Sequence, residues 1–257
     1  MLIEPDSTQT WHHERVEPWF DTHVHWDRYS EPERKAMLSR AADAEVRFIS
    51  VAVDLASSSR LLACEGAIGV CVGVHPRHAG QPLTHELRDL TVDPAVLAIG
   101  ECGFDVEGSS AEEQSGAFAF QATLARERGL PIVLHIDGPG CFERLVQHGY
   151  AVEGVRVIRH YFTGDQAQAD WHRDRAHYLS FGNPLRRDPG LREIARHYPE
   201  HLLLIETDSY PLPNRNTEPA HVARVGETLA LLRDWRFAEA REILAENTRA
   251  AFPALSR

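Results

Sequence analysis

The 257 residues of this chain suit one large domain, and a hydrophobic share of 43% with a charged share of 25% is ordinary for a soluble globular protein. The formal charge of −11 at pH 7 argues against broad electrostatic binding of nucleic acid. It does not exclude a local phosphate site whose positive charge comes from bound metal.

The chain begins with a polar stretch, residues 1–18, which we interpret as an N-terminal extension of a single domain spanning residues 1–257. This stretch contains no apolar signal-peptide core, and no later apolar run approaches the roughly 18 residues of a membrane span. The four cysteines include no C-x-x-C pair, which favours reduced thiols over a disulfide framework. We therefore expect a cytoplasmic protein with no membrane partner.

Short apolar runs then alternate with helical stretches along the rest of the chain. The apolar runs predict strands at residues 19–24, 46–53, 70–76, 96–101, 131–135, 155–161, 177–182 and 202–208. The stretches between and after them predict helices at residues 31–44, 54–67, 84–91, 111–128, 141–149, 165–174, 188–197, 219–233 and 237–250.

Eight strands that alternate with helices over this length are the pattern of a (β/α)8 TIM barrel, an α/β fold. The near-continuous apolar strands agree with a parallel sheet that is buried on both faces. A doubly wound open sheet is the alternative architecture. No G-x-G-x-x-G follows the first strand, which weakens the dinucleotide-binding version of that alternative.

Two histidines, His23 and His25, stand at the end of the first predicted strand. Because strand side chains alternate between faces, both imidazoles point the same way, about 7 Å apart along the strand. Such a pair can share a metal ion. In a chain with 15 histidines the His-x-His spacing is a weak signal by itself, so the remaining ligands decide the matter.

Barrel enzymes build their sites at the carboxyl ends of the strands. The predicted strand ends carry six side chains that can bind metal: His23, His25, Glu101, His135, His160 and Asp208. A structural role explains any one of them more readily than all six together. Six nitrogen and oxygen ligands predict two divalent metal ions that share a carboxylate, and the mixed set without cysteine favours zinc, manganese or magnesium.

The chain resembles the TatD family of metal-dependent hydrolases, the TatD-type deoxyribonucleases within the amidohydrolase-like barrels. The matching blocks follow the family order between about residues 20 and 252. They are Asp21–His25, Gly73–Pro76, Ile99–Asp105, Gln114 with Gln121, Gly129–His135, His160–Gly164, Glu206–Asp208, Arg215–Pro219, and Asn247–Thr248 with Phe252.

The resemblance implies a role for each candidate ligand. His23, His25, Glu101 and Asp208 would hold one metal, and Glu101, His135 and His160 would hold the second, with Glu101 as the bridge. The catalytic residues would be Glu101 and Asp208, of which Asp208 orients or deprotonates the attacking water. His75 and Arg215 are the candidate substrate contacts. Glu206 we expect to be structural, one step deeper on the strand than Asp208.

Two positions depart from the family pattern. Asp137 stands two residues after His135, where the family usually has an arginine, and Ser209-Tyr210-Pro211 replaces an Ala-Pro that usually follows the eighth strand. An anion in place of a cation weakens or re-aims phosphate binding. The replacement cations would be Arg77, Arg186, Arg187 or Arg215. Tyr161, Phe162 and Tyr210 can stack on a base, but packing of the barrel mouth is the role that we favour.

The resemblance predicts a divalent-metal-dependent nuclease that hydrolyses DNA phosphodiester bonds, a 3′-to-5′ exonuclease on single-stranded ends. Two alternatives remain open. The first is a metal-dependent hydrolase of a small amide, lactone or ester, which the Asp137 departure favours. The second is a partner-binding subunit of a multi-protein assembly, for example in bacterial defence, although the complete ligand set argues against an inactive barrel.

Overall fold

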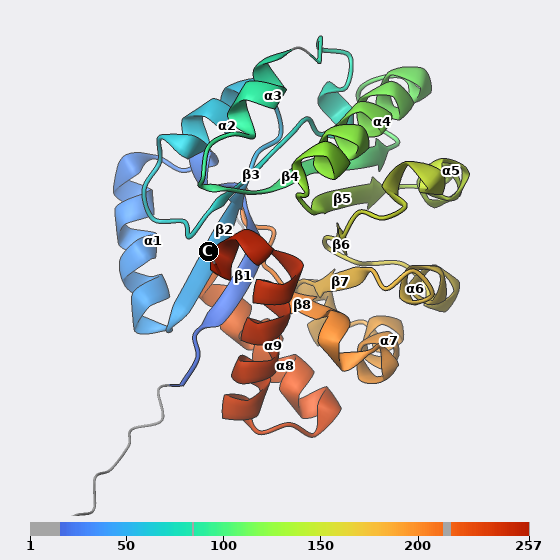
Figure 1. The fold of residues 1–257 in the computed structure, drawn as a ribbon. Coiled ribbons are helices and arrows are strands. Elements are labelled where there is room, and N and C mark those ends of the chain that lie inside the picture. Colours follow the sequence, from blue (N-terminus) through green and yellow to red (C-terminus); the bar gives the residue numbers. More distant parts are fainter. Residues whose placement is uncertain (1–15, 84, 213–216, 257) are drawn as a thin grey trace, which may run out of the picture.

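The computed structural model describes residues 16–83, 85–212 and 217–256. Eight parallel strands follow one another around a barrel, and helices pack outside them (Figure 1). The strands are β1 (Trp19–Val24), β2 (Val46–Val51), β3 (Val70–Val72), β4 (Val96–Asp105), β5 (Ile132–Asp137), β6 (Val157–Arg159), β7 (Tyr178–Phe181) and β8 (Leu203–Ile205). The α-helices are α1 (Glu31–Asp43), α2 (Leu55–Leu62), α3 (His85–Leu90), α4 (Ala111–Arg128), α5 (Cys141–His148), α6 (Gln166–Arg173), α7 (Pro189–His197), α8 (Val222–Arg233) and α9 (Phe237–Ala251).

The first and last strands meet at a seam that lacks a regular hydrogen-bond ladder. A single parallel bridge joins Val24 to Ser209, where the amide of His25 donates to the Ser209 carbonyl over 3.0 Å. Deeper in the barrel, the Thr22 hydroxyl donates to the Ile205 carbonyl over 3.1 Å. These contacts nearly close the barrel, so the predicted (β/α)8 fold is confirmed.

The fourth strand differs from its predicted bounds. It was expected to end at Glu101, but β4 continues to Asp105. Its pairing with β5 shifts register between Ile99 and Cys102, and Gly100 in that interval has a φ of +135°. A bulge of this kind bends a strand and re-aims a side chain. Glu101 therefore sits within β4, and the true end of the strand carries a second carboxylate.

The longest helix among the described residues, α4, connects β4 to β5. Helix α4 begins after Ser110, whose hydroxyl accepts from the Glu113 amide while the Glu113 carboxylate accepts from the Ser110 amide. This reciprocal cap satisfies two amides at the helix start. The helix ends at Gly129, whose φ of 65° is the left-handed conformation that suits glycine at a helix end.

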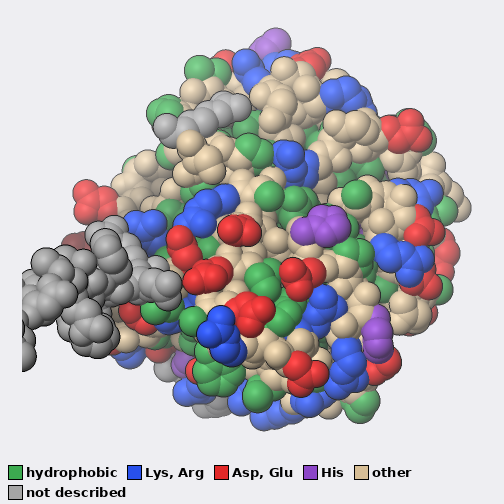
Figure 2. Space-filling view, turned by 60° about the horizontal axis from the view of Figure 1, so that its bottom comes forward, with side chains coloured by type: hydrophobic (Ala, Val, Ile, Leu, Met, Phe, Trp, Pro, Cys, Tyr) green, Lys and Arg blue, Asp and Glu red, His purple; other side chains and the backbone are tan. Residues whose placement is uncertain are grey.

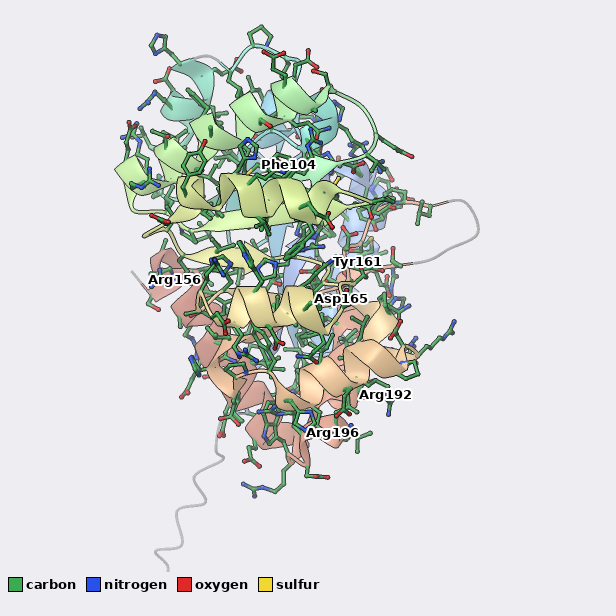
Figure 3. All side chains as sticks on the ribbon, turned by 90° about the vertical axis from the view of Figure 1, so that its right-hand side faces the viewer. Phe104, Arg156, Tyr161, Asp165, Arg192 and Arg196 are labelled. Carbon is green, nitrogen blue, oxygen red and sulfur yellow. The ribbon has the colours of Figure 1, made fainter. Side chains whose placement is uncertain are left out.

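Short 3-10 turns follow several strands at the rim. Those that matter for the site are η1 (Trp26–Arg28), η2 (Pro76–His78), η4 (Asn183–Arg186) and η6 (Pro219–His221). Figure 3 places the two ends of the barrel at opposite sides, with Arg156 before β6 at one end and Tyr161 after it at the other. On the face drawn in Figure 2, acidic and basic side chains are interspersed.

None of the helices in the described residues combines the length and apolar character that crossing a bilayer requires. Residues 1–15 of the predicted N-terminal extension lie outside the described residues, and its last residues already run into β1. The assignment of residues 1–257 to one domain stays a prediction.

Candidate metal centre

The first strand carries two buried imidazoles to the carboxyl end of the barrel. His23 is 0% exposed and His25 is 8% exposed, and their ring centroids lie 5.0 Å apart. His25 Nδ1 lies 3.0 Å from the Val51 carbonyl oxygen, so the ring proton is placed on Nδ1. That tautomer leaves the Nε2 lone pair of His25 directed toward Glu101 and Asp208.

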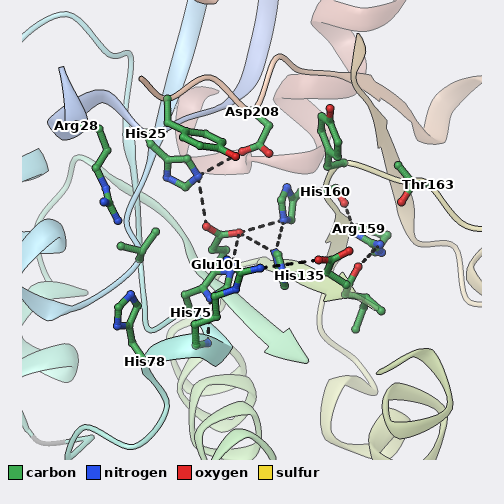
Figure 4. Close-up of a pocket in the computed structure, with 16 residues that line it drawn as sticks. His25, Arg28, His75, His78, Glu101, His135, Arg159, His160, Thr163 and Asp208 are labelled. Atoms are coloured by element: carbon green, nitrogen blue, oxygen red, sulfur yellow. Dashed lines mark hydrogen bonds and ion pairs between the residues drawn. The ribbon is translucent and has the colours of Figure 1, made fainter. Parts of the chain in front are cut away.

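Glu101 is the centre of the cluster (Figure 4). Its Oε1 lies 3.5 Å from His25 Nε2, and its Oε2 lies 3.8 Å from His23 Nε2. The Asp208 Oδ1 atom lies 3.3 Å from His25 Nε2 and 3.9 Å from His23 Nε2. The four side chains predicted to hold one metal therefore converge on one point of the rim.

The second predicted group converges on the same carboxylate through its Oε2 atom. Glu101 Oε2 lies 3.2 Å from His135 Nδ1 and 3.0 Å from His160 Nε2, and those two nitrogens are 3.0 Å apart. Glu101, His135 and His160 thus form one set of possible ligands, and His23, His25 and Glu101 form another. Glu101 belongs to both sets, which is the arrangement expected of a bridging carboxylate.

A second carboxylate stands behind each of these two histidines. His135 Nε2 lies 3.0 Å from Asp105 Oδ2, and His160 Nδ1 lies 3.2 Å from Glu206 Oε1. A carboxylate that accepts the far ring proton fixes the tautomer and leaves the near nitrogen free to bind metal. Glu206 is fully buried and also accepts the Tyr161 amide over 2.8 Å, which supports the structural role predicted for it.

Asp105 is a site residue that the sequence reasoning missed. Asp105 belongs to the matching block Ile99–Asp105, but no role was predicted for it because the strand was expected to end at Glu101. The glycines on either side of Glu101, Gly100 and Gly103, were the available signal, since glycine inside a strand often marks a bulge.

Two buried glutamines on α4 hold the loops that carry the site. Gln114 accepts from the Asp105 amide over 3.1 Å and donates to the Asp105 carbonyl over 2.9 Å. Gln121 accepts from the Val74 amide over 2.8 Å and donates to the Val74 carbonyl over 3.0 Å. Each amide side chain therefore replaces a strand neighbour and fixes the backbone beside Asp105 and His75.

The electrostatics of the cluster match the needs of a bound cation. Both ring nitrogens of His23 are buried without a hydrogen-bond partner in the described structure. Burial by itself raises the pKa of the Glu101 carboxyl, but His75, His160 and the other histidines hold that pKa well below its usual range. Burial lowers the pKa of His160, whereas Glu101 and Glu206 raise it to about 10. The unpartnered nitrogens of His23 are available as metal ligands, and the carboxylates of Glu101 and Glu206 stabilise positive charge nearby. Both features fit a bound divalent metal.

A cavity of about 400 Å³ opens over this cluster (Figure 4). Its lining includes His75, whose Nδ1 accepts from the Arg77 amide over 3.0 Å, so that Nε2 carries the ring proton. Burial lowers the pKa of His75 to about 3. His75 is therefore a neutral donor at the edge of the site.

The predicted substrate cations have different outcomes. Arg77 lines the cavity, but its guanidinium pairs with Asp105 over 2.9 Å and Glu107 over 3.1 Å, and lies 3.9 Å from Asp137. Arg186 lines a separate cavity, and Arg215 lies outside the described residues. Two arginines that the sequence reasoning did not single out, Arg28 and Arg159, line the main cavity.

The predicted aromatic residues divide between the cavity and the core. Tyr161 and Tyr210 line the cavity, and the Tyr210 ring centroid lies 5.9 Å from that of His25. Phe162 is 1% exposed and packs in the hydrophobic core, so it is not available for stacking on a base. Asp137 also lines the cavity, with its side chain 58% exposed.

Comparisons with known proteins agree with this geometry. The family model described as TatD related DNase matches residues 20–253. The chain is 34% identical over 201 residues to the 3′-5′ ssDNA/RNA exonuclease TatD of Erwinia amylovora, covering 70% of this chain and 76% of that protein. It is 29% identical over 250 residues to the metal-dependent hydrolase YabD of Bacillus subtilis, covering 91% and 98%.

A solved structure gives the same result for the fold. The TatD homologue YJJV of Escherichia coli K12 superposes with a TM-score of 0.79 at 26% identity, covering 93% of this chain and 99% of that one. The barrel, the clustered histidines and carboxylates, and these matches lead to one assignment. The chain belongs to the TatD-related DNase family of metal-dependent hydrolases.

Proposed function

We propose that this protein is a two-metal nuclease that hydrolyses phosphodiester bonds of DNA from single-stranded 3′ ends. The observation that carries the proposal is the position of Glu101, whose carboxylate belongs to both sets of possible ligands: Oε1 lies 3.5 Å from His25 Nε2, and Oε2 lies 3.0 Å from His160 Nε2. The relatives named as 3′-5′ ssDNA/RNA exonucleases support the substrate class and the polarity. Zinc, manganese and magnesium all suit the imidazole and carboxylate donors.

His23, His25, Glu101 and Asp208 would hold one ion, and Glu101, His135 and His160 would hold the other. Bound metal supplies Lewis-acid polarisation of the phosphoryl oxygen and lowers the pKa of a water molecule. Asp208 orients that water and accepts its proton. Burial raises the pKa of Asp208, but His25 and His23 outweigh burial and keep it below the usual range, so Asp208 is a carboxylate at neutral pH.

In the hydrolysis, a water oxygen forms a bond to phosphorus and the bond from phosphorus to the leaving sugar oxygen breaks. The leaving oxygen takes up a proton. His75 lines the cavity and is suited to donate a hydrogen bond to a phosphate oxygen through Nε2, which lies 4.0 Å from Glu101 Oε2. Binding of only a few nucleotides at a narrow site also agrees with the net charge of −11, which disfavours broad electrostatic contact with a long nucleic acid.

The test is an exonuclease assay on single-stranded DNA labelled at the 5′ end, run separately with magnesium, manganese and zinc. We expect stepwise shortening from the 3′ end that His135→Ala abolishes. His197→Ala is the matched control, because this histidine lies on α7 with its side chain 65% exposed. Absence of nucleotide release with all three metals would overturn the proposal.

The same preparation distinguishes the two alternatives. Turnover of a lactone or amide panel without DNA hydrolysis would assign the barrel to small substrates. A protein that binds no metal, and whose cellular phenotype is unchanged by Asp208→Asn, would instead be a partner-binding subunit. Mixed products from both DNA and RNA would widen the substrate class without changing the mechanism.

We also propose a cytoplasmic location. All four cysteines are free, and Cys71, Cys102 and Cys141 are buried. Free thiols are typical of a reducing compartment. Cell fractionation with an antibody to the protein tests this location.

A further inference from the structure

A second cavity lies on the same rim as the metal centre. It has a volume of about 170 Å³ and lies between the turn that follows β7, the end of β8 and the start of α8. We call it the arginine cavity. Its lining residues are Asn183, Arg186, Thr207, Thr217, His221, Arg224 and Val225.

The lining of the arginine cavity provides hydrogen-bond donors and positive charge, with no acidic residue among those that line it. Neither Arg186 nor Arg224 lies within ion-pair distance of a carboxylate among the residues that the structure describes. Arg186 donates to Asn183 Oδ1 over 3.2 Å, which leaves the Asn183 amide group as a further donor.

His221 completes the cluster. Burial lowers its pKa, Glu218 raises it, and Arg224, Arg40 and Arg186 lower it. Arg186, His221 and Arg224 all line this cavity, and His221 Nε2 lies 3.7 Å from Glu218 Oε1. Neutral imidazole can donate one hydrogen bond without adding repulsion to the two guanidinium groups.

The arginine cavity and the cavity over the metal centre are lined by consecutive residues of the segment that follows β8. Thr207 lines the arginine cavity, and the next residue, Asp208, lines the cavity over the metal centre. Thr217 of the arginine cavity also donates to the carbonyl of Tyr210, which lines the other cavity. Barrel enzymes frequently form phosphate sites from the loops after the seventh and eighth strands.

We propose that the arginine cavity binds a backbone phosphate of the same nucleic acid strand whose 3′ end lies at the metal centre. This inference rests on the proposed nuclease function and adds a subsite that distinguishes a polynucleotide from a small phosphate ester. Arg186 and Arg224 bind the phosphate oxygens with charge-assisted hydrogen bonds, and Asn183 adds a neutral donor.

The test compares Arg224→Gln and Arg186→Gln with the wild type on two substrates. One is a single-stranded DNA oligonucleotide, and the other is bis(p-nitrophenyl) phosphate, whose one phosphate reaches the metal centre alone. We expect kcat/KM on the oligonucleotide to fall about tenfold in each variant. We also expect its dependence on log salt to become shallower by about 0.7, the value for one phosphate contact on a single strand. The rate on the small diester should stay unchanged.

Two further variants separate charge from structure. Arg224→Lys keeps the positive charge and should retain the wild-type salt slope. Arg196→Gln removes an exposed arginine toward the other end of α7 (Figure 3) and should leave both substrates unaffected. Melting temperatures of all variants verify that they fold.

Each outcome decides between the inferences. If the wild type hydrolyses only the small diester, or hydrolyses neither substrate, the nuclease function itself is overturned. Hydrolysis of both with unchanged salt slopes in the two glutamine variants overturns only the arginine cavity. Calorimetric binding of inorganic phosphate that depends on Arg224, without an effect on the oligonucleotide, would identify a site for a free anion instead.

Discussion

Asp105 Oδ2 lies 3.0 Å from His135 Nε2 and 2.9 Å from Arg77 Nε, so one carboxylate oxygen joins an imidazole to a guanidinium. The side chain of Asp105 is fully buried, and its other oxygen accepts the Glu107 amide over 2.8 Å. His135 is thereby held with its proton on Nε2 and its Nδ1 lone pair toward Glu101 and His160. The orientation of one proposed metal ligand depends on a residue that contacts no other candidate ligand.

Asp105→Asn should weaken metal binding at the Glu101, His135 and His160 set by about 10- to 100-fold, because the amide no longer carries the charge that fixes the His135 tautomer. Isothermal titration with zinc or manganese measures the affinity of each site separately. Glu107→Gln is the matched control, since it removes another partner of Arg77 and leaves His135 untouched. Equal metal affinities in Asp105→Asn and the wild type would show that Asp105 has no positioning role.

Gly103→Ala should destabilise the protein by more than about 3 kcal/mol. Gly103 has a φ of +145°, and a Cβ atom there would lie 2.0 Å from the His135 carbonyl oxygen. Chemical denaturation measures the free energy of unfolding. Gly116→Ala is the control, because a Cβ on this helical glycine meets nothing within 4 Å, and it should raise stability by about 0.5–1 kcal/mol. Comparable stability in both variants would contradict the bulge geometry around Glu101.

His23→Leu should have opposite effects with and without metal. In EDTA the variant should be more stable than the wild type by roughly 1–3 kcal/mol, because two unpartnered buried nitrogens are removed. Excess zinc or manganese should stabilise the wild type by about 2.7 kcal/mol at 100 times Kd and the variant by much less. Differential scanning fluorimetry measures both shifts. A variant that gains as much from metal as the wild type would exclude His23 from the ligand set.

The stability of the metal-free protein should fall as the pH drops from about 6.5 to about 4. His177 is buried, and burial together with the charge of Arg175 lowers its pKa to about 4. The unfolded chain therefore takes up a proton in this window while the folded chain does not, a loss of up to about 3 kcal/mol at 1.36 kcal/mol per pKa unit. Its Nδ1 lies 3.0 Å from Nδ1 of His172 in the core.

His177→Gln should reduce this pH dependence, whereas His197→Gln, at an exposed histidine, should leave it unchanged. Urea unfolding in EDTA at pH 7.5, 5.5 and 4.5 measures the slope. An identical slope in His177→Gln and the wild type would assign the acid sensitivity to other groups.

The alternation of apolar runs with helical stretches predicted all eight strands, because strands buried on both faces of a barrel must be apolar nearly throughout. Strand ends then predicted which side chains share a rim. Asp105 escaped because a bulge extends β4 beyond its apolar run, and register shifts of this kind depend on contacts with the neighbouring strand. Arg159 was not predicted either. Strand alternation does not determine where its long side chain ends, and that side chain donates to the carbonyls of Ile136 and His160.

The seam between β1 and β8 has a consequence for how the barrel responds to chelation. His23 and His25 belong to the first strand and Asp208 follows the last, so a metal held by all three would act as a crosslink between the two ends of the sheet. Hydrogen exchange at the His25 amide, which donates to Ser209, would then report on metal occupancy directly. Removal of the ion should speed exchange there, while the amides of the β2 and β3 ladder, which carries no proposed metal ligand, keep their protection.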